Sequence, residues 1–274
     1  FDEAQDADPV MLDVVNSQSC QVVYCGDSFQ AVYEWRGAID ALEMVHTDTT
    51  LWLTESFRFG QEIADEANTI LNLISTGAGK LVGQARLNSR VEQVDEPDAI
   101  MCRTNAGVVH ALLQQQAAGR KSALLGPVRK ALLEFGEGCR TLQQGGRSGH
   151  PELAPFTDWS EVTRWMEENP DDDSELSTLG RVAKAVGVDS YIAAISRTVD
   201  ERVGDVLVST VHRTKGREWK SVQLGGDFRH LSDMDEDELK IVYVACTRAK
   251  EALDKSNLPL NSGDKPVWWQ KPLN

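Results

Sequence analysis

Short, β-prone apolar runs alternate along this chain with longer stretches of helical periodicity, and this alternation limits the folds that the chain can adopt. Residues 21–25 and 51–54 have the pattern of buried strands, whereas residues 9–17 and 63–74 repeat apolar side chains at helical spacing. Strands and helices that alternate along a chain are typical of an α/β protein with parallel sheets. We therefore predict this fold class for residues 1–77.

The same alternation continues in the rest of the chain. Further strands are predicted at residues 99–102, 206–211 and 221–224, and further helices at residues 106–118 and 235–250. The stretch 136–203 has a different composition, with Gly and Pro turns and helical patches around 158–168, 175–186 and 190–202. We interpret it as a helical insertion within the second α/β unit.

Composition narrows the class of protein without deciding its function. With 28 Lys and Arg against 43 Asp and Glu, the 274 residues carry a net charge of −15. This charge argues against a protein that binds nucleic-acid phosphates non-specifically over its whole surface, but it does not exclude a local basic groove. No apolar run approaches the ~20 residues of a membrane span, and no secretion leader is found. The five cysteines form no CxxC pair, so we expect neither a disulfide framework nor a zinc cluster. Because the chain begins at Phe1 within an acidic motif, we expect it to be part of a longer protein.

The acidic motif at the start of the chain pairs two carboxylates, Asp2 and Glu3, where a strand is expected to end. One carboxylate in such a place can hold Mg²⁺ while the other orients a water molecule. A second strand-end loop, residues 26–30, ends on Gln30, whose amide could sense a terminal phosphate in the same crevice. The alternatives are that the acidic pair is solvated surface and that residues 26–27 are merely a turn.

Two segments place aromatic side chains beside arginine. Tyr33 and Trp35 precede Arg36, and Phe57 precedes Arg58 directly after a predicted strand. An aromatic face beside a guanidinium can stack on an unpaired base and reach a phosphate. The alternative for Tyr33 and Trp35 is a place in the hydrophobic core.

Two polar segments follow apolar elements near the end of the chain. Residues 210–219 concentrate cations, hydroxyls and Glu218 after a buried strand, where ligands of parallel sheets usually bind. Residues 243–250 are interpreted as the end of an apolar helix, where Arg248 and Lys250 could also simply complement the helix dipole. By contrast, residues 76–81 only imitate a phosphate loop, because Ile74 and Leu81 replace the required Gly and hydroxyl residue.

Taken together and in this order, these segments resemble the motifs of the UvrD/Rep/PcrA-like superfamily 1A DNA helicases. The corresponding motifs are II (residues 2–6), III (26–38), IV (54–58), the segment 102–105, V (210–219) and VI (243–250). Residues 56–60 and the short insertion look most like the F-box DNA helicase branch or its bacterial relatives.

The resemblance implies a role for each matching side chain. Asp2 would bind Mg²⁺, Glu3 would activate the attacking water, and Gln30 would couple the γ-phosphate of ATP to DNA. Arg58 and Arg248 would stabilise charge on the transferred phosphoryl group. The adenine would stack on Phe57, the ribose would bind Glu218, and Lys215 and Gly216 would shape the nucleotide loop. The residues implied in contacts with single-stranded DNA are Tyr33, Trp35, Arg36, Thr210 and His212.

The resemblance also implies a domain arrangement. Two RecA-like lobes would hold ATP, with the rear of the first lobe at residues 1–77, the second lobe at 78–135 and 204–258, a reduced 2B-like insertion at 136–203 and a tail at 259–274. The phosphate loop and motif Ia would lie upstream of Phe1. We therefore expect residues 1–274 alone to be inactive.

The implied activity is that of an ATP-dependent, Mg²⁺-requiring helicase. It would move 3′ to 5′ on single-stranded DNA, engage duplex junctions and act in processes such as DNA repair. The cell compartment would be the cytoplasm of a bacterium or the nucleus of a eukaryote.

Two other functions remain open from the residues. A non-catalytic nucleic-acid-binding scaffold with a helicase fold would be expected to have lost the motif arginines or Glu3. In this sequence the arginines and Glu3 are all present. A Mg²⁺ nuclease built on Asp2 and Glu3 would need further clustered carboxylates beyond Asp6 and Asp27.

Overall fold

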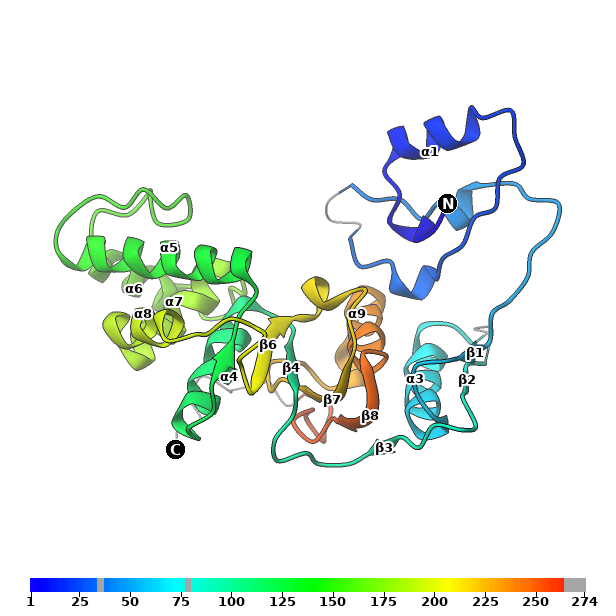
Figure 1. Ribbon diagram of the computed structural model, residues 1–274. Helices are drawn as coiled ribbons and strands as arrows, with labels where there is room; N and C mark the ends of the chain where they lie inside the picture. Colours follow the sequence, from blue (N-terminus) through cyan, green and yellow to red (C-terminus); the bar gives the residue numbers. More distant parts are fainter. Residues whose placement is uncertain (34–36, 77–79, 264–274) are drawn as a thin grey trace. The chain divides into compact units, whose positions relative to one another are not determined.

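The computed structural model describes residues 1–33, 37–76 and 80–263, and these form two compact units (Figure 1). The first unit comprises Phe1–Glu92, Val211–Lys220 and His230–Leu253. The second unit comprises Gln93–Thr210, Ser221–Arg229 and the chain from Asp254 onward. Each unit is therefore assembled from segments that lie far apart in the sequence.

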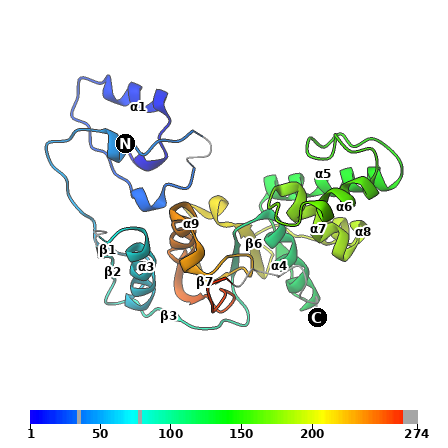
Figure 2. The ribbon, with the colours of Figure 1, turned by 180° about the vertical axis from the view of Figure 1, so that it is seen from behind.

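Several helices of the first unit begin at acidic N-caps, which accept hydrogen bonds from otherwise unpaired backbone N–H groups. Asp8 caps α1 (Pro9–Asn16) through the Met11 N–H at 2.8 Å, and Asp235 caps α9 (Glu236–Cys246) through the Glu238 N–H at 2.9 Å. A longer helix, α3 (Gln61–Ile74), packs against α9, as Figures 1 and 2 both show. Shorter turns are η1 (Ala4–Asp6), η2 (Ser28–Gln30), α2 (Ala41–Met44), η4 (Val211–Thr214) and η5 (Leu231–Asp233).

The strands of the first unit are short and parallel. β1 (Glu55–Ser56) pairs with β2 (Val82–Gly83), and β3 (Arg90–Val91) pairs with β8 (Ala249–Asp254). The prediction of strands at residues 21–25 and 51–54 is wrong, because neither run is assigned as a strand. The backbones of Val23 and Cys25 bond to the backbone of Phe1, while Leu51, Trp52 and Leu53 are 74–85% exposed. A β-prone run becomes a strand only where a neighbouring strand completes its hydrogen bonds.

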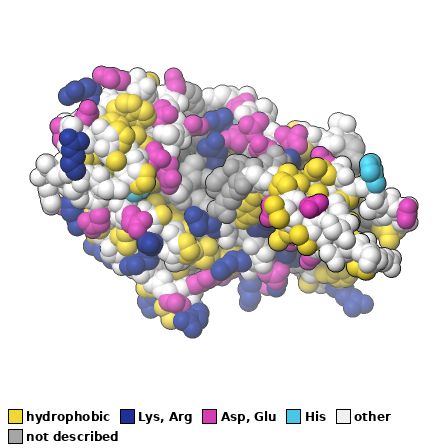
Figure 3. Space-filling view, turned by 90° about the horizontal axis from the view of Figure 1, so that it is seen from above, with side chains coloured by type: hydrophobic (Ala, Val, Ile, Leu, Met, Phe, Trp, Pro, Cys, Tyr) yellow, Lys and Arg dark blue, Asp and Glu magenta, His cyan; other side chains and the backbone are white. Residues whose placement is uncertain are grey.

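Helix α1 presents apolar side chains to the surface. It buries only Leu12, whereas Val10, Met11 and Val14 are 50–73% exposed. Figure 3 shows hydrophobic side chains gathered on the side of the molecule that carries α1 in Figure 1. The amphipathic pattern of residues 9–17 is therefore correctly predicted as a helix, although most of its apolar stripe is not core.

The second unit contains a largely buried parallel sheet. Its central strand, β4 (Ala99–Cys102), lies between β6 (Val206–Thr210) and the end of β7 (Trp219–Leu224). Beyond β6 comes β5 (Ser122–Ala123), in parallel register with it. Strands buried on both faces read as continuous apolar runs, which is why the sequence predicts β4 and β6 well.

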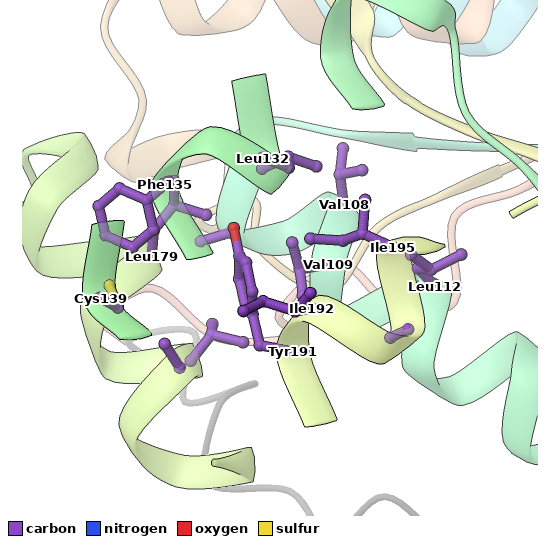
Figure 4. Packing of buried hydrophobic residues seen from close by; sticks show 14 of the residues in the cluster. Val108, Val109, Leu112, Leu132, Phe135, Cys139, Leu179, Tyr191, Ile192 and Ile195 are labelled. Carbon is purple, nitrogen blue, oxygen red and sulfur yellow. The ribbon is translucent and has the colours of Figure 1, made fainter. Parts of the chain in front are cut away.

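Helices supply most of the core of the second unit. They are α4 (Asn105–Ala117), α5 (Gly126–Gln143), α6 (Trp159–Glu168), α7 (Glu175–Val186) and α8 (Val188–Ser196). Figure 4 shows Tyr191 of α8 among apolar side chains from α4, α5 and α7. The helical character predicted for residues 136–203 is confirmed, but α5 begins ten residues earlier, at Gly126.

A buried carboxylate joins two loops of the second unit. Asp227, 4% exposed, accepts hydrogen bonds from the Arg103 N–H at 3.1 Å and the Thr104 N–H at 2.7 Å. The Thr104 hydroxyl donates a third bond to it at 2.8 Å. Thr104 in turn caps α4, so Asp227 fixes the start of that helix.

The predicted fold class is confirmed: the protein is a mixed α/β structure with parallel sheets and several helices. Helices in the described residues are all too short or too polar to cross a membrane. The division into two lobes and an insertion stays a prediction.

Candidate functional site

Five segments of the first unit meet around one cluster of charged and amide side chains. They are residues 1–6, 26–33, 56–58, 211–218 and 243–250. These segments contain most of the side chains that the sequence singles out.

The acidic segment holds its two carboxylates in a constrained backbone. Glu3 has a φ of 53°, in the left-handed region that non-glycine residues rarely adopt. Its N–H donates to the Asp2 carboxylate at 3.0 Å, and its own carboxylate accepts from the Gln5 side chain at 2.6 Å. Both carboxylates are exposed and have defined local partners.

Gln5 ties the acidic segment to the following loop. This buried side chain, 1% exposed, accepts a hydrogen bond from the Asp27 N–H at 3.0 Å. A Cβ atom at Gly26 would lie 2.3 Å from the Gln5 side-chain oxygen, so a larger residue there would displace the Gln5 amide. The two strand-end loops predicted to share a crevice are thus bonded to each other.

Gln30 has both ends of its amide fixed. Its nitrogen donates to the Asp27 carboxylate at 2.8 Å, and its oxygen accepts from the Arg248 guanidinium at 3.2 Å. The Tyr243 hydroxyl donates to the same Asp27 oxygen at 3.0 Å. Burial, together with the neighbouring Asp27 charge, raises the pKa of Tyr243, so the phenol is a neutral donor at physiological pH.

Arg248 and Arg58 converge on Thr247. Arg248 is 2% exposed and donates to the Thr247 hydroxyl and to the Val244 carbonyl, each at 3.0 Å. Arg58 donates to the Thr247 backbone carbonyl at 3.0 Å. Burial and the nearby Arg58 charge lower the pKa of Arg248 to about 10, so the Arg248 guanidinium stays charged at neutral pH and is repelled by that of Arg58. An anion placed beside both would relieve this repulsion.

Glu218 bridges two cations. Its carboxylate lies 2.8 Å from the Arg58 guanidinium and 2.9 Å from the Lys250 ammonium. These hydrogen bonds lower its pKa to about 2, so Glu218 is ionised throughout the physiological range. Lys250 does not lie on a helix, because α9 ends at Cys246 and β8 starts at Ala249. The expected helix over residues 235–250 is therefore too long.

Lys215 points toward the acidic segment. Its side chain is 7% exposed, forms an ion pair with Asp6, and lies 3.4 Å from a Glu3 oxygen. It also donates to the Gln30 carbonyl at 2.9 Å. Burial raises the pKa of Asp6, an effect that the Lys215 ammonium opposes. Gly216 follows with a φ of +79°, a conformation that favours glycine.

The predicted DNA-contacting residues have different environments. Tyr33 donates its hydroxyl to the His212 carbonyl, and the two rings lie 6.4 Å apart. Thr210 ends β6 in the second unit, where it is 7% exposed. Trp35 and Arg36 lie outside the described residues, as do residues 77–79 of the rejected phosphate loop. Phe57, assigned to the adenine, is 76% exposed, so one ring face is open to a stacking partner.

The acidic segment fits a divalent cation only in part. Its carboxylate oxygens are the hard donors that Mg²⁺ prefers, and the buried Asp6 Oδ1 atom makes no hydrogen bond. Within the described residues, however, no group of three or more His, Cys, Asp or Glu side chains could hold a metal alone. Mg²⁺ at such a site usually takes its remaining ligands from water and substrate phosphates.

The sequence did not indicate a role in the site for several residues that the structure places in this cluster. Gln5, Asp27 and Tyr243 orient the predicted side chains, and Asp6 is the ion-pair partner of Lys215. All four lie inside the quoted motifs, but short polar segments do not indicate which side chains meet. That information comes from the contacts between segments.

Comparison with known proteins indicates the family to which the chain is related. The sequence profile of the UvrD-like helicase C-terminal domain matches residues 205–253, which include β6, η4, β7, α9 and most of β8. F-box DNA helicase protein 1 of Schizosaccharomyces pombe is 30% identical over 289 residues, covering 92% of this chain and 33% of that protein. F-box DNA helicase 1 of Gallus gallus is 30% identical over 287 residues, covering 92% of this chain and 28% of that protein. The chain thus spans about a third of the length of these relatives.

Proposed function

Because this chain belongs to the UvrD-like helicases, we propose that it forms part of an ATP-driven DNA helicase that moves 3′ to 5′ along one strand. The observation that carries the proposal is the meeting of Arg58 and Arg248 at Thr247, beside the fixed amide of Gln30. Two charged guanidiniums and a primary amide are suited to the oxygens of a terminal phosphate.

The proposal gives each charged residue a role. Arg58 and Arg248 stabilise the negative charge that develops on the phosphoryl group during transfer. Gln30 binds the terminal phosphate and couples phosphate binding to the position of the neighbouring loops. Asp2 would hold Mg²⁺, which would neutralise phosphate charge, and Glu3 would accept a proton from the attacking water. The exposed Phe57 ring stacks on adenine, while Glu218 accepts a hydrogen bond from the ribose. Lys215 and Gly216 shape the adjoining loop.

Single-stranded DNA binds through the second set of predicted residues. Tyr33, Trp35 and Arg36 provide aromatic and cationic contacts, and Thr210 and His212 bind the strand backbone. We propose that the protein acts in the nucleus of a eukaryotic cell or in the cytoplasm of a bacterium. DNA repair is one of the processes in which it would act. Both relatives described above are eukaryotic DNA helicases by name.

The test uses the complete gene product and three duplexes, with a 3′ tail, a 5′ tail or no tail. We expect ATP hydrolysis that single-stranded DNA stimulates, and unwinding of the 3′-tailed duplex only. The Glu3→Gln variant, which keeps shape and removes the base, should bind DNA without turnover. Unwinding of the 5′-tailed duplex alone would contradict the polarity.

The same experiment separates the other functions. DNA binding without any ATP turnover would favour a non-catalytic scaffold. Mg²⁺-dependent cleavage of the oligonucleotides would favour a nuclease.

A further inference from the structure

Tyr33 makes a contact that base stacking does not explain. Its hydroxyl donates a hydrogen bond to the backbone carbonyl of His212, 179 residues away in the sequence. Both residues belong to the first unit, and Tyr33 is only partly exposed. A tyrosine that served only as a stacking platform would need its ring and not its hydroxyl.

The turn that accepts this bond is itself compact. In η4, Val211 and Thr214 are fully buried, and the Thr214 hydroxyl donates to the Val211 carbonyl at 2.7 Å. His212 lies between them, so its carbonyl is a fixed point on a short rigid turn. The Tyr33 hydroxyl therefore attaches its segment to the body of η4.

Lys215 provides a second attachment between the same two segments. Its ammonium donates to the Gln30 carbonyl at 2.9 Å and lies 5.7 Å from the centre of the Tyr33 ring, within cation–π range. Residues 30–33 are thus bonded to residues 212–215 at both ends. The Gln30 side chain, at the start of this bonded stretch, contacts Arg248.

We propose that Tyr33 is a positioning residue, which holds η4 against the Gln30 segment through its hydroxyl. This inference rests on the proposed function, because it assigns how a turn that binds the DNA strand is linked to the amide that senses phosphate. A shift of His212 on strand binding moves the Tyr33 segment with it, and through that segment Gln30. The Tyr33 hydroxyl supplies one of the two attachments between these segments, and Lys215 supplies the other.

The test compares Tyr33→Phe with the wild type in the complete gene product. Phenylalanine keeps the ring, and with it any stacking, but removes the hydroxyl. The measurements are the affinity for an oligo(dT) of about 20 nucleotides, which exceeds the site size of a single groove, the DNA-stimulated ATPase rate, and amide hydrogen exchange of residues 211–217.

We expect faster amide exchange in residues 211–217 of Tyr33→Phe, by about fivefold, the factor that one lost hydrogen bond gives. DNA stimulation of ATP hydrolysis should fall by about fivefold, a typical size for coupling between sites. Affinity for the oligonucleotide should stay close to that of the wild type, because the ring remains.

Tyr24→Phe is the matched control, since Tyr24 also donates its hydroxyl, to Asn16, but on the exposed surface of the same unit. Unchanged exchange in Tyr33→Phe would overturn the proposal, and so would an equal change in Tyr24→Phe. If exchange responds as expected but wild-type ATPase shows no DNA stimulation, the positioning role stands and the proposed function fails.

Discussion

The guanidinium of Arg248 donates a hydrogen bond to the side-chain oxygen of Gln30 over 3.2 Å. The two residues are 218 positions apart in the sequence, and Arg248 is almost completely buried. Because the Gln30 nitrogen is held by Asp27, the amide can turn toward a new partner only if one of these bonds breaks. The contact therefore joins the motif near the start of the chain to the motif near its end.

Arg248→Lys should stop ATP turnover and leave DNA binding intact. Lysine keeps the charge but lacks the planar fork that bonds Gln30, Thr247 and Val244 together. We expect kcat for ATP in the complete gene product to fall by about a thousandfold, the size that the proposed arginine-finger role implies. Steady-state ATPase assays and oligonucleotide binding by fluorescence anisotropy measure the two effects.

The control is Arg202→Lys, which changes an arginine that is 89% exposed and pairs only locally with Asp200. It should leave both quantities at the wild-type level. Loss of DNA binding in Arg248→Lys to the same extent as turnover would argue for general damage to the fold.

Phe57→Ala should weaken ATP binding without slowing the chemical step. The exposed ring is assigned to stack on adenine, and a base–aromatic stack contributes about 1–3 kcal/mol. KM for ATP should therefore rise by about tenfold while kcat changes little, because a uniform binding contribution is removed. Phe57→Tyr should restore KM, and Leu53→Ala, also highly exposed, should have no effect. A fall in kcat with constant KM would contradict the assignment.

Glu218→Gln should cost stability at neutral pH and much less in acid. The pKa of Glu218 is lowered from 4.5 to about 2, so its carboxylate stabilises the fold above pH 4.5 and loses this contribution as the pH falls through 2. Because Glu218 is 43% exposed, the full effect at pH 7 should be at most about 1 kcal/mol. Urea unfolding of both proteins at a series of pH values measures the difference. A difference that grows on acidification would contradict the sign.

Asp227→Asn should destabilise the second unit strongly. The Asp227 carboxylate now accepts hydrogen bonds from the N–H groups of Arg103 and Thr104 and from the Thr104 hydroxyl. In the Asn variant, an amide nitrogen, which cannot accept, would face some of these donors. We expect a loss of about 2–3 kcal/mol in the free energy of unfolding, the cost of leaving buried donors unsatisfied. Asp98→Asn is the control, since the exposed Asp98 accepts from the Ser221 N–H and hydroxyl at the surface. An equal loss in both variants would show that burial does not decide the effect.

Helices and strands with a clear apolar periodicity could be predicted from the sequence. Elements whose existence or length depends on a partner strand could not. Helices α1 and α3 and strands β4 and β6 follow directly from apolar spacing. The β-prone run at residues 51–54 is not a strand, because a strand exists only with a partner. The end of α9 was misplaced, since Ala249 and Lys250 suit a helix locally but are taken into β8 beside β3.

For the candidate site, the sequence indicated the side chains but not their contacts. Arg58, Arg248 and Gln30 were singled out by motif, and their convergence on one another depends on segments far apart in the chain. The partnership of Lys215 with Asp6 could not be read from spacing, because 209 residues separate them. Their assigned roles toward ATP and DNA stay predictions.

The α/β class, the order of the helicase-like motifs and the residue types available to the site can all be derived from the amino-acid order, because periodicity and residue chemistry are local properties of the chain. The contacts cannot: that Glu218 is shared by Arg58 and Lys250, that Tyr33 bonds to His212 and that Lys215 is buried among acidic residues is visible only in the folded protein. A hydrogen bond or ion pair depends on a separation of a few ångströms in space. Packing of α3 against α9 and closure of the loops set those separations, and no local pattern in the sequence encodes them.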